Sequence, residues 1–463
     1  MSKKFNLLLF CLIYLFCFSQ NSFANSANYN SLDLSKTYFL ALKNDSEFQI
    51  QHFSALANKE KINQAKAALL PQINISAKSI YNKATIKPEN SVHSFQPKYN
   101  SNAYQIDFIQ PLFRWNLLQN YRQAADLFEK ADLEFLQSQQ NLILKTARLF
   151  FDLQIAQQNL IAAENNLAAI SQQLELAKYN FDVGTATITD FHESKARFDL
   201  AKSQKISAQN QMEMANANLQ NLIANSQNTQ NSFKFLKLND FENVDKLQQK
   251  IQKLLQNLDL KQAKQIAKDN NLTIKIQQFN LQIAQKETAK SRGNFLPSVD
   301  FVAQHAKSKD ISQATLLPTH ANINSVGVVI SLPIFQSGLT ISQVRENLYN
   351  QQAAESALSL AEKSADLQTE QFFLTTQNGL AEIVALKSAW KSSQTALQST
   401  KTAAEIGLRI NLDILNAQTQ IYQTKVKLFK AIFDTIFSAL SLKAAIGNLN
   451  EQDITTINQM LFE

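Results

Sequence analysis

Apolar residues recur every seven positions along two long stretches of the chain. In the first stretch the repeated positions are Leu153, Leu160, Leu167, Leu174 and Phe181. A second set follows the first four of these by three residues and comprises Ala156, Ala163, Ile170 and Ala177. In the second stretch the repeated positions are Ile383, Trp390, Leu397 and Ala404, then Ile414, Ile421 and Leu428. Such spacing places one apolar seam along a helix, so both stretches predict long coiled coils.

Each seam is interrupted once, at a glycine. Gly184 lies within Asn180–Phe191, and Gly407 lies within Ala404–Ile414. Glycine provides the positive φ that a tight reversal needs, and the Thr, Asn and Asp residues that follow are types that begin a new helix. The two stretches therefore predict antiparallel helical hairpins with tips at 181–190 and 404–413.

Apolar residues recur at every second position in four further segments. Ile73, Ile75 and Ala77 alternate with Asn74, Ser76 and Lys78, and the same period of two recurs three more times. It predicts strands at about 72–86, 100–113, 297–308 and 321–333. Each strand would have one apolar and one polar face, so the expected fold is mainly α with a small β part.

Helical patterns fill the remaining proline-free segments. A single helix is expected over about 33–69 and another over about 259–292, and each ends before a Leu-Pro pair, at Pro71 and at Pro297. A third helix should run from about 115 to the first tip, with a return helix to about 225. At 1.5 Å per residue, the third helix would be roughly 100 Å long.

The order of predicted helices, strands and glycine turns in the first half of the chain is repeated in the second half. Leu70-Pro71 and Leu296-Pro297 are 226 positions apart, Pro111 and Pro333 are 222 apart, and Gly184 and Gly407 are 223 apart. A common offset indicates an internal duplication. The expected division is a first repeat at 25–225, a linker or equatorial region at 226–258, a second repeat at 259–446 and a C-terminal equatorial segment at 447–463.

The N-terminus has the features of a secretory signal peptide covering 1–24. Lys3 and Lys4 precede the apolar run Phe5–Phe18, and the small residues of Ser22–Ala24 follow it. The alternative is a retained membrane anchor, but the run is shorter than the roughly 18 to 20 residues that a spanning helix needs. Both cysteines lie within this segment, which excludes disulfides and thiolate metal sites from the mature chain.

Composition and motifs point away from enzymes. The formal charge of +7 becomes +5 without the two signal lysines, and it is spread without a basic cluster, so nucleic-acid binding is not indicated. The scattered histidines are His52, His93, His192, His305 and His320. They form no pair at metal-binding spacing, and no glycine-rich phosphate loop is present. No catalytic residue, metal or cofactor is therefore predicted, and energy for any transport would come from a partner.

The four strands restrict how this chain could cross a membrane. Two open edges would leave backbone donors and acceptors unpaired in hydrocarbon, so the sheet must close by association. Two copies would give eight strands with an interior filled by side chains, whereas three would give twelve strands and room for water. A trimer is the smallest open barrel.

Several short motifs resemble the TolC-like family of outer-membrane efflux proteins. They are Leu70-Pro71, Leu332–Phe335, Val183–Thr185, Ile188–Asp190, Asp413–Leu415 with Ala417, and Ala444–Asp453. The resemblance covers essentially the whole mature chain. It implies a homotrimeric 12-stranded transmembrane β-barrel, an α-helical barrel and an equatorial domain, located in the outer membrane of a Gram-negative bacterium. It also implies passive export of drugs and other small molecules, with proteins as further cargo. The implied partners are outer-membrane lipid, a periplasmic adaptor and an inner-membrane efflux or ABC transporter.

The same resemblance assigns a periplasmic gate to the hairpin tips. Thr189 and Asp190 would link to Arg409, while Asp413 would add a ring of carboxylates to the bore. Asn416 stands where the family has a second ring aspartate, and Ala404 stands where it has a gate tyrosine. The alternative for Asp190 and Asp413 is helix capping without any further role.

The turns themselves match those that meet adaptor hairpins in the family. The implied contact residues are Val183, Gly184 and Thr185 in the first turn, and Ile406, Gly407 and Leu408 in the second. The alternative is that each glycine serves a tight turn only. The second turn lacks the usual threonine.

A function of another class also fits long coiled coils, namely a periplasmic scaffold or adaptor without a pore. The four alternating strands favour the channel, because an adaptor needs no lipid-facing surface. In a channel, the loops at about 83–102 and 307–321 would face the cell exterior.

Overall fold

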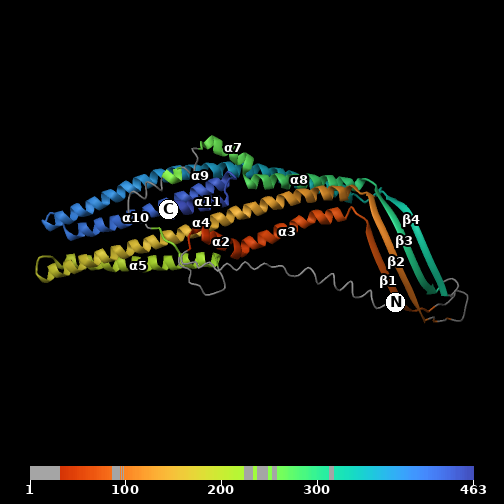
Figure 1. Cartoon of the computed structure of the whole chain (residues 1–463), viewed down its shortest axis with the longest axis horizontal. Helices are drawn as coiled ribbons and strands as arrows, with labels where there is room; N and C mark the ends of the chain where they lie inside the picture. Colours follow the sequence, from red (N-terminus) through yellow and green to blue (C-terminus); the bar gives the residue numbers. More distant parts are fainter. Residues whose placement is uncertain are drawn as a thin grey trace.

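The computed structural model describes residues 32–85, 94, 96, 98–223, 233–236, 249–252, 258–311 and 318–462. The predicted signal peptide, most of the predicted linker and the central parts of the two predicted exterior loops lie outside these residues. The molecule is elongated, with helices along its length and a sheet at one end (Figure 1). The hairpin tips lie at the opposite end from the sheet.

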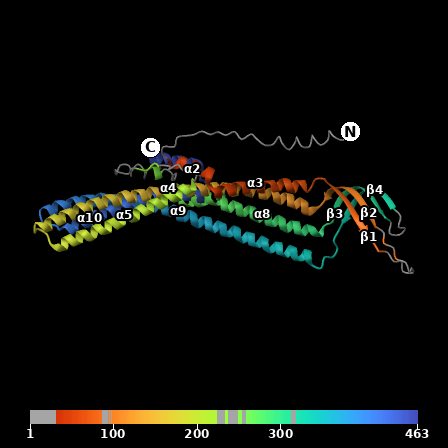
Figure 2. The same cartoon turned by 90° about the horizontal axis from the view of Figure 1, so that it is seen from below.

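Two long helical hairpins form the body of the fold, as the heptad pattern predicts. α4 (Trp115–Asp182) packs against α5 (Ile188–Leu222), and α9 (Leu339–Glu405) packs against α10 (Asn411–Ala445). The two hairpins run beside each other (Figure 2). Ile170, Ile383, Trp390, Ile414 and Leu428 of the predicted seams are buried.

The prediction of single helices over 33–69 and 259–292 is wrong, because each region contains two helices. These are α2 (Leu34–Asn44) with α3 (Ser46–Ala67), and α7 (Leu260–Asn270) with α8 (Leu272–Arg292). The carboxylate of Asp45 accepts a hydrogen bond from the Phe48 N–H at 2.7 Å, and Asn271 accepts one from the Ile274 N–H at 3.1 Å. Side chains of this kind begin a new helix and interrupt the old one. The two breaks are 226 positions apart, the offset of the two Leu-Pro pairs.

The four predicted strands form one antiparallel sheet in the order β1-β2-β3-β4. Their bounds are β1 (Gln72–Lys83), β2 (Lys98–Phe113), β3 (Ser298–Ile311) and β4 (Pro318–Ser331). β1 ends before the predicted boundary, whereas β2, β3 and β4 extend further toward the loops than predicted. These outer ends are largely polar, so the alternation that marks a strand is absent from them.

One face of the sheet is apolar near the helices. Ile75, Ile106 and His305 lie in one cross-strand row of this face, and Ile73, Phe108, Ala303 and Val326 lie in the next. We call this the apolar face, and the opposite one the polar face. On the polar face the Asp107 carboxylate accepts hydrogen bonds from Gln105 at 2.8 Å and Gln304 at 3.2 Å. The sheet therefore has the two-sided character that the alternation predicts.

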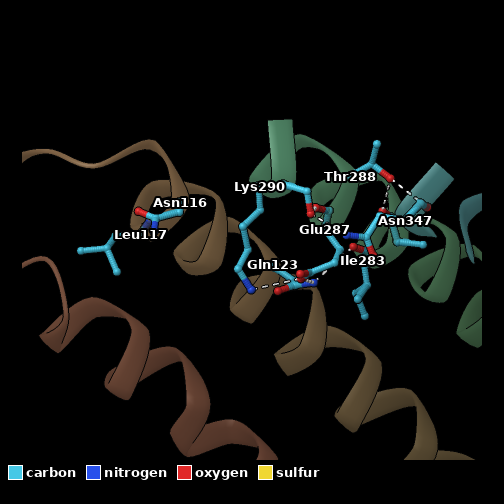
Figure 3. A network of polar contacts seen from close by, with 10 residues as sticks. Asn116, Leu117, Gln123, Ile283, Glu287, Thr288, Lys290 and Asn347 are labelled. Atoms are coloured by element: carbon cyan, nitrogen blue, oxygen red, sulfur yellow. Dashed lines mark hydrogen bonds and ion pairs between the residues drawn. The ribbon is translucent and has the colours of Figure 1, made fainter. Parts of the chain in front are cut away.

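The sheet is fastened to the helices at the start of α4. The Arg114 guanidinium makes two hydrogen bonds to the Asp300 carboxylate, of 2.7 Å and 2.6 Å. Further along, Gln123 of α4 donates to Glu287 of α8 at 2.9 Å, and Thr288 donates to the backbone of Asn347 in α9 at 3.1 Å (Figure 3). These contacts place α8 between α4 and α9 and join the two halves of the chain.

The main hydrophobic core lies midway along the molecule. Phe150, Phe151 and Phe433 are buried where α4 meets α10, and Ile457 of α11 (Glu451–Phe462) is buried with them. α11 also packs on α2, where the Tyr38 hydroxyl donates to the Glu451 carboxylate at 3.0 Å. Burial and the nearby carboxylate raise the pKa of Tyr38. The helix α11 is thus part of this core.

Within the described residues, no helix has the length and apolar character required to span a bilayer.

Candidate functional site at the hairpin tips

The first tip is a helix-terminating turn built around Gly184. This residue has a φ of +78°, and its N–H donates to the Phe181 carbonyl at 3.0 Å. The Thr185 N–H donates to the Asn180 carbonyl at 2.8 Å. This pair of hydrogen bonds around a left-handed residue is the Schellman motif, which satisfies the last carbonyls of α4.

The second tip repeats the motif. Gly407 has a φ of +76°, its N–H donates to the Ala404 carbonyl at 3.0 Å, and the Leu408 N–H donates to the Ala403 carbonyl at 2.8 Å. A Cβ added to either glycine would meet no atom within 4 Å. The requirement for glycine therefore comes from the backbone angle and not from crowding.

Large apolar side chains surround both glycines and lie in solvent. Val183 is 53% exposed, Ile406 is 68% exposed and Leu408 is 74% exposed. None of these side chains is needed for the turn, whose hydrogen bonds are made by backbone atoms. Apolar groups gathered at a protruding tip are typical of a surface that contacts another protein.

Asp190 forms a capping box with Thr187 at the start of α5. One oxygen of its carboxylate accepts from the Thr187 N–H at 3.0 Å and from the Thr187 hydroxyl at 2.8 Å. In return, the Asp190 N–H donates to the Thr187 hydroxyl oxygen at 3.2 Å. Asp190 thus has the capping role that the sequence left open. Thr189, beside it, is exposed.

Arg409 and Asp413 are neighbours across one turn at the second tip. The Arg409 Nη1 atom lies 3.5 Å from the Asp413 Oδ2 atom. The N-cap of α10 is Ile410, which has no side-chain capping bond, so Asp413 supplies negative charge in the first turn without capping it. The Arg409 side chain is 61% exposed, and an exposed pair of this kind is worth only about 0 to 1 kcal/mol.

A cavity of about 520 Å³ separates the two tips within one chain. Asp190 borders it from the first hairpin, and Arg409 and Ala404 border it from the second. The structure therefore brings Asp190 and Arg409 to the same cavity without an ion pair between them. Ala404 has too small a side chain to reach across it.

Two hydrogen bonds join the hairpins close to the start of α5 and α10. The Asn411 amide donates to the Ser194 hydroxyl at 2.9 Å, and the Arg197 guanidinium donates to the Asn416 side chain at 3.0 Å. Asn416, predicted in the gate, is thus a contact between hairpins. Ser194, Arg197 and Asn411 were not predicted, since their partners lie more than 200 positions away. The position of Asn411 directly after the turn is the one local signal.

The described residues hold no group of three or more His, Cys, Asp and Glu side chains placed to bind a metal ion. The tips instead offer apolar side chains, backbone turns and a few charges. A sheet with one apolar face at one end and such tips at the other defines the architecture of an outer-membrane channel with a long helical extension.

The family is shown by comparison. The sequence model described as "Outer membrane efflux protein" matches residues 37–225 and 263–448, and the chain belongs to this family. The protein is an outer-membrane efflux channel whose large helical part lies in the periplasm.

Individual relatives agree with this assignment. The chain is 28% identical to the outer membrane protein TolC of Escherichia coli K12 over 416 residues, which cover 87% of this chain and 79% of TolC. It is 23% identical to the proteases secretion protein PrtF of Dickeya chrysanthemi, over 92% of this chain and 90% of PrtF. The solved structure of the Campylobacter jejuni CmeC outer membrane channel matches with a TM-score of 0.75 at 16% identity, covering 94% of this chain and 90% of CmeC.

Proposed function

We propose that three copies of this chain assemble into a passive duct for export. The observation that carries this proposal is the sheet, whose edge strands β1 and β4 have no partner within the described part of the chain. Unpaired backbone groups are costly in hydrocarbon, and three four-stranded sheets would close into a twelve-stranded barrel with an open interior. The apolar face would contact lipid and the polar face would line the lumen.

The helices continue this duct below the membrane. α4 has 68 residues and α9 has 67, so each is roughly 100 Å long, while the hydrocarbon core of a bilayer is about 30 Å thick. The hairpins of three copies would form a helical barrel through the periplasm. The two separate family matches and the equivalent breaks at Asp45 and Asn271 support an origin of this plan by duplication.

The tips would form the periplasmic gate. In a ring of three copies, Arg409 of one copy would meet Thr189 and Asp190 of its neighbour, and Asp413 would face the bore. Two features support this arrangement. The capping box uses only one oxygen of the Asp190 carboxylate, and most of the Arg409 side chain is exposed. Directional bonds from a guanidinium to a carboxylate are well suited to such a link.

The turns would contact a periplasmic adaptor through Val183, Gly184, Thr185, Ile406, Gly407 and Leu408. The adaptor would connect the duct to an inner-membrane efflux pump or ABC transporter, which supplies the energy. Because the family is described as efflux proteins and one relative is named for protease secretion, we propose both small molecules and proteins as cargo.

Membrane fractionation and surface labelling test the duct. The mature protein should be recovered from outer membranes as a trimer and should form conducting pores in planar bilayers. A cysteine at Thr85, an exposed position in the first predicted exterior loop, should react with an impermeant thiol reagent on intact cells, whereas one at Thr185 should not. Recovery as a soluble species without pores would support the scaffold alternative, and reversed labelling would overturn the orientation.

Cargo is tested by deleting the gene. Drug accumulation and secretion of proteins into the medium should be measured separately in the deletion strain. An increase in accumulation identifies efflux, and loss of secreted proteins identifies secretion. If neither changes, the proposed export function is wrong.

A further inference from the structure

Charge is divided unevenly between the two faces of the sheet. The cationic residues on the apolar face gather near its loop end and comprise Lys83, Lys98, Lys307 and Lys309, with the imidazole of His320 beside them. All three acids of the strands, Asp107, Asp300 and Asp310, lie on the polar face. The polar face has one strand lysine, Lys78. The apolar face thus holds a cluster of cations without any acidic residue among its described strand positions.

The cluster begins where the apolar residues end. Along β3, Val299, Phe301 and Ala303 come first, and Lys307 and Lys309 lie further from the helices. At about 3.3 Å per residue, Lys307 is roughly 26 Å beyond Val299 along the strand. Strands of outer-membrane barrels tilt by about 35 to 45°, so this length corresponds to roughly 20 Å of height, and the apolar band of such barrels is about 25 Å tall. The lysines therefore lie near the upper border of a band of this height.

A cavity of about 410 Å³ lies at this border. Its lining from the apolar face includes Asn102, Tyr104, Lys307, Lys309, His320 and Asn322. Lys309 is paired with Asn102 and His320 across the strands, and Lys307 is paired with Tyr104 and Asn322. The two lysines and His320 are exposed. Within the part of the chain that the structure describes, no carboxylate lies within ion-pair distance of either lysine.

The chemistry of this cavity fits an anion with several acceptor oxygens. Two ammonium groups provide up to six N–H donors, the asparagines provide amide donors, and no acid opposes them. Phosphate is the common membrane anion of this kind, and basic clusters at a membrane surface bind phosphorylated headgroups. Below the cavity, Ile75, Ile106 and Val326 are exposed and provide an apolar surface for acyl chains.

We propose that this cavity binds the phosphate groups of a phosphorylated glycolipid in the outer leaflet, with its acyl chains against the apolar face below. The inference rests on the membrane orientation proposed above for the sheet. A lipid is favoured over a free phosphate because the cationic and apolar surfaces are continuous on one face. One ligand that has both parts would gain from both contacts.

Binding is measured with the full-length mature protein in detergent, freed of lipid. The probe is a bis-phosphorylated diglucosamine glycolipid, and its retention is counted by native mass spectrometry over a concentration series. The same glycolipid without phosphates, and inorganic phosphate alone, are the two comparison ligands. Only the phosphorylated glycolipid should bind tightly.

Lys307→Gln should weaken retention about fivefold, and Lys307→Gln with Lys309→Gln about 25-fold. Lys78→Gln is the matched control, because it removes the same charge from the other face of the sheet at a neighbouring level. It should leave retention unchanged. Equal loss with Lys78→Gln, equal binding of the dephosphorylated glycolipid, or equal binding of inorganic phosphate would each overturn the inference.

Planar-bilayer conductance of the same samples separates this inference from the duct itself. One outcome is that the variants insert and conduct as the wild type does, while glycolipid retention is unchanged by the loss of Lys307 and Lys309. In that outcome only the glycolipid site is wrong. If the wild-type protein neither inserts nor conducts, the duct and the site are both overturned. Trimer mobility on native gels checks that the variants fold.

Discussion

The side-chain amide of Asn411 donates a hydrogen bond of 2.9 Å to the hydroxyl of Ser194, which is fully buried. Asn411 is the first residue of α10, and Ser194 lies near the start of α5. The bond therefore ties the second hairpin to the first one close to both tips. If the tips separate when the gate opens, this contact opposes the movement.

Ser194→Ala should therefore favour the open channel. A hydrogen bond of this kind contributes about 1 kcal/mol, which corresponds to an increase of about fivefold in open probability. Single-channel recording in planar bilayers measures it. Thr402→Ala is the control, because it removes a hydroxyl near the tips that bonds only within its own helix, to the Gln398 carbonyl. An unchanged open probability for Ser194→Ala would show that the hairpins do not separate at this point.

The charged residues of the second tip should have separable effects. Arg409→Ser should raise single-channel conductance, because it removes the donor of the proposed links to a neighbouring copy. Asp413→Asn should instead reduce cation preference and block by multivalent cations, because it removes charge from the bore. The 3.5 Å contact between the two side chains predicts that Asp413→Asn also frees Arg409, with a smaller effect on opening.

Lys391→Ser, at an exposed position of α9 away from the tips, provides the control for loss of positive charge. It should leave conductance as it is in the wild type. If Arg409→Ser and Asp413→Asn also leave conductance and selectivity unchanged while the protein remains trimeric, the proposed gate is wrong for this protein.

Gly184→Ala and Gly407→Ala should each destabilise a tip by about 1 to 2 kcal/mol, because both positions have a positive φ that an L side chain disfavours. Hydrogen exchange of tip peptides should become at least about fivefold faster, since the turn amides would open more often. Gly327→Ala is the control, because Gly327 is likewise free of neighbours within 4 Å but has no positive φ. Equal exchange in all three variants would contradict the turn argument.

Arg148→Met should destabilise the packing of α4 on α10. The Arg148 guanidinium contacts the Asp152 carboxylate at 3.1 Å and the Asp434 carboxylate at 3.0 Å, so its removal leaves two carboxylates facing each other. These groups are partly exposed, so the loss at pH 7 should be about 1 kcal/mol. Thermal unfolding of the purified protein, followed by circular dichroism, measures it.

The loss of stability caused by Arg148→Met should become smaller as the pH falls from 7 toward about 4. Burial raises the pKa of Asp152, and the charge of Asp434 adds to this, while Arg148 opposes both. A carboxyl with a raised pKa takes up its proton in the folded state first, so its protonation stabilises the fold as the pH falls. Without Arg148, protonation of Asp152 stabilises the fold by a larger amount. An equal loss of stability in Arg148→Met at pH 7 and at about pH 4 would contradict this pH dependence. Lys430→Met, at the edge of the same cluster, provides a comparison.

Local patterns in the sequence were sufficient to predict the hairpins, the strands and the turns. The seams through Ile170 and Ile383 and the alternation through Ile73 and Ile75 are visible as the spacing of apolar residues a few positions apart, and the glycines of the tips mark local backbone conformations. A single sequence displays such a period even though the buried residues contact distant parts of the chain. The helix breaks at Asp45 and Asn271 were also local, but a capping residue within a continuing apolar pattern does not by itself show that the helix ends there.

Only the tertiary structure decided which distant residues meet. It paired Asn411 with Ser194 and Arg197 with Asn416, and it placed Arg409 beside Asp413 instead of Asp190. It also aligned Lys307 and Lys309 with His320 and Asn102 on one face of the sheet. The physical reason is that the register between helices and between strands is set by the packing of the whole interface. A shift of one residue would change every such partner while leaving the periodicity of the sequence the same.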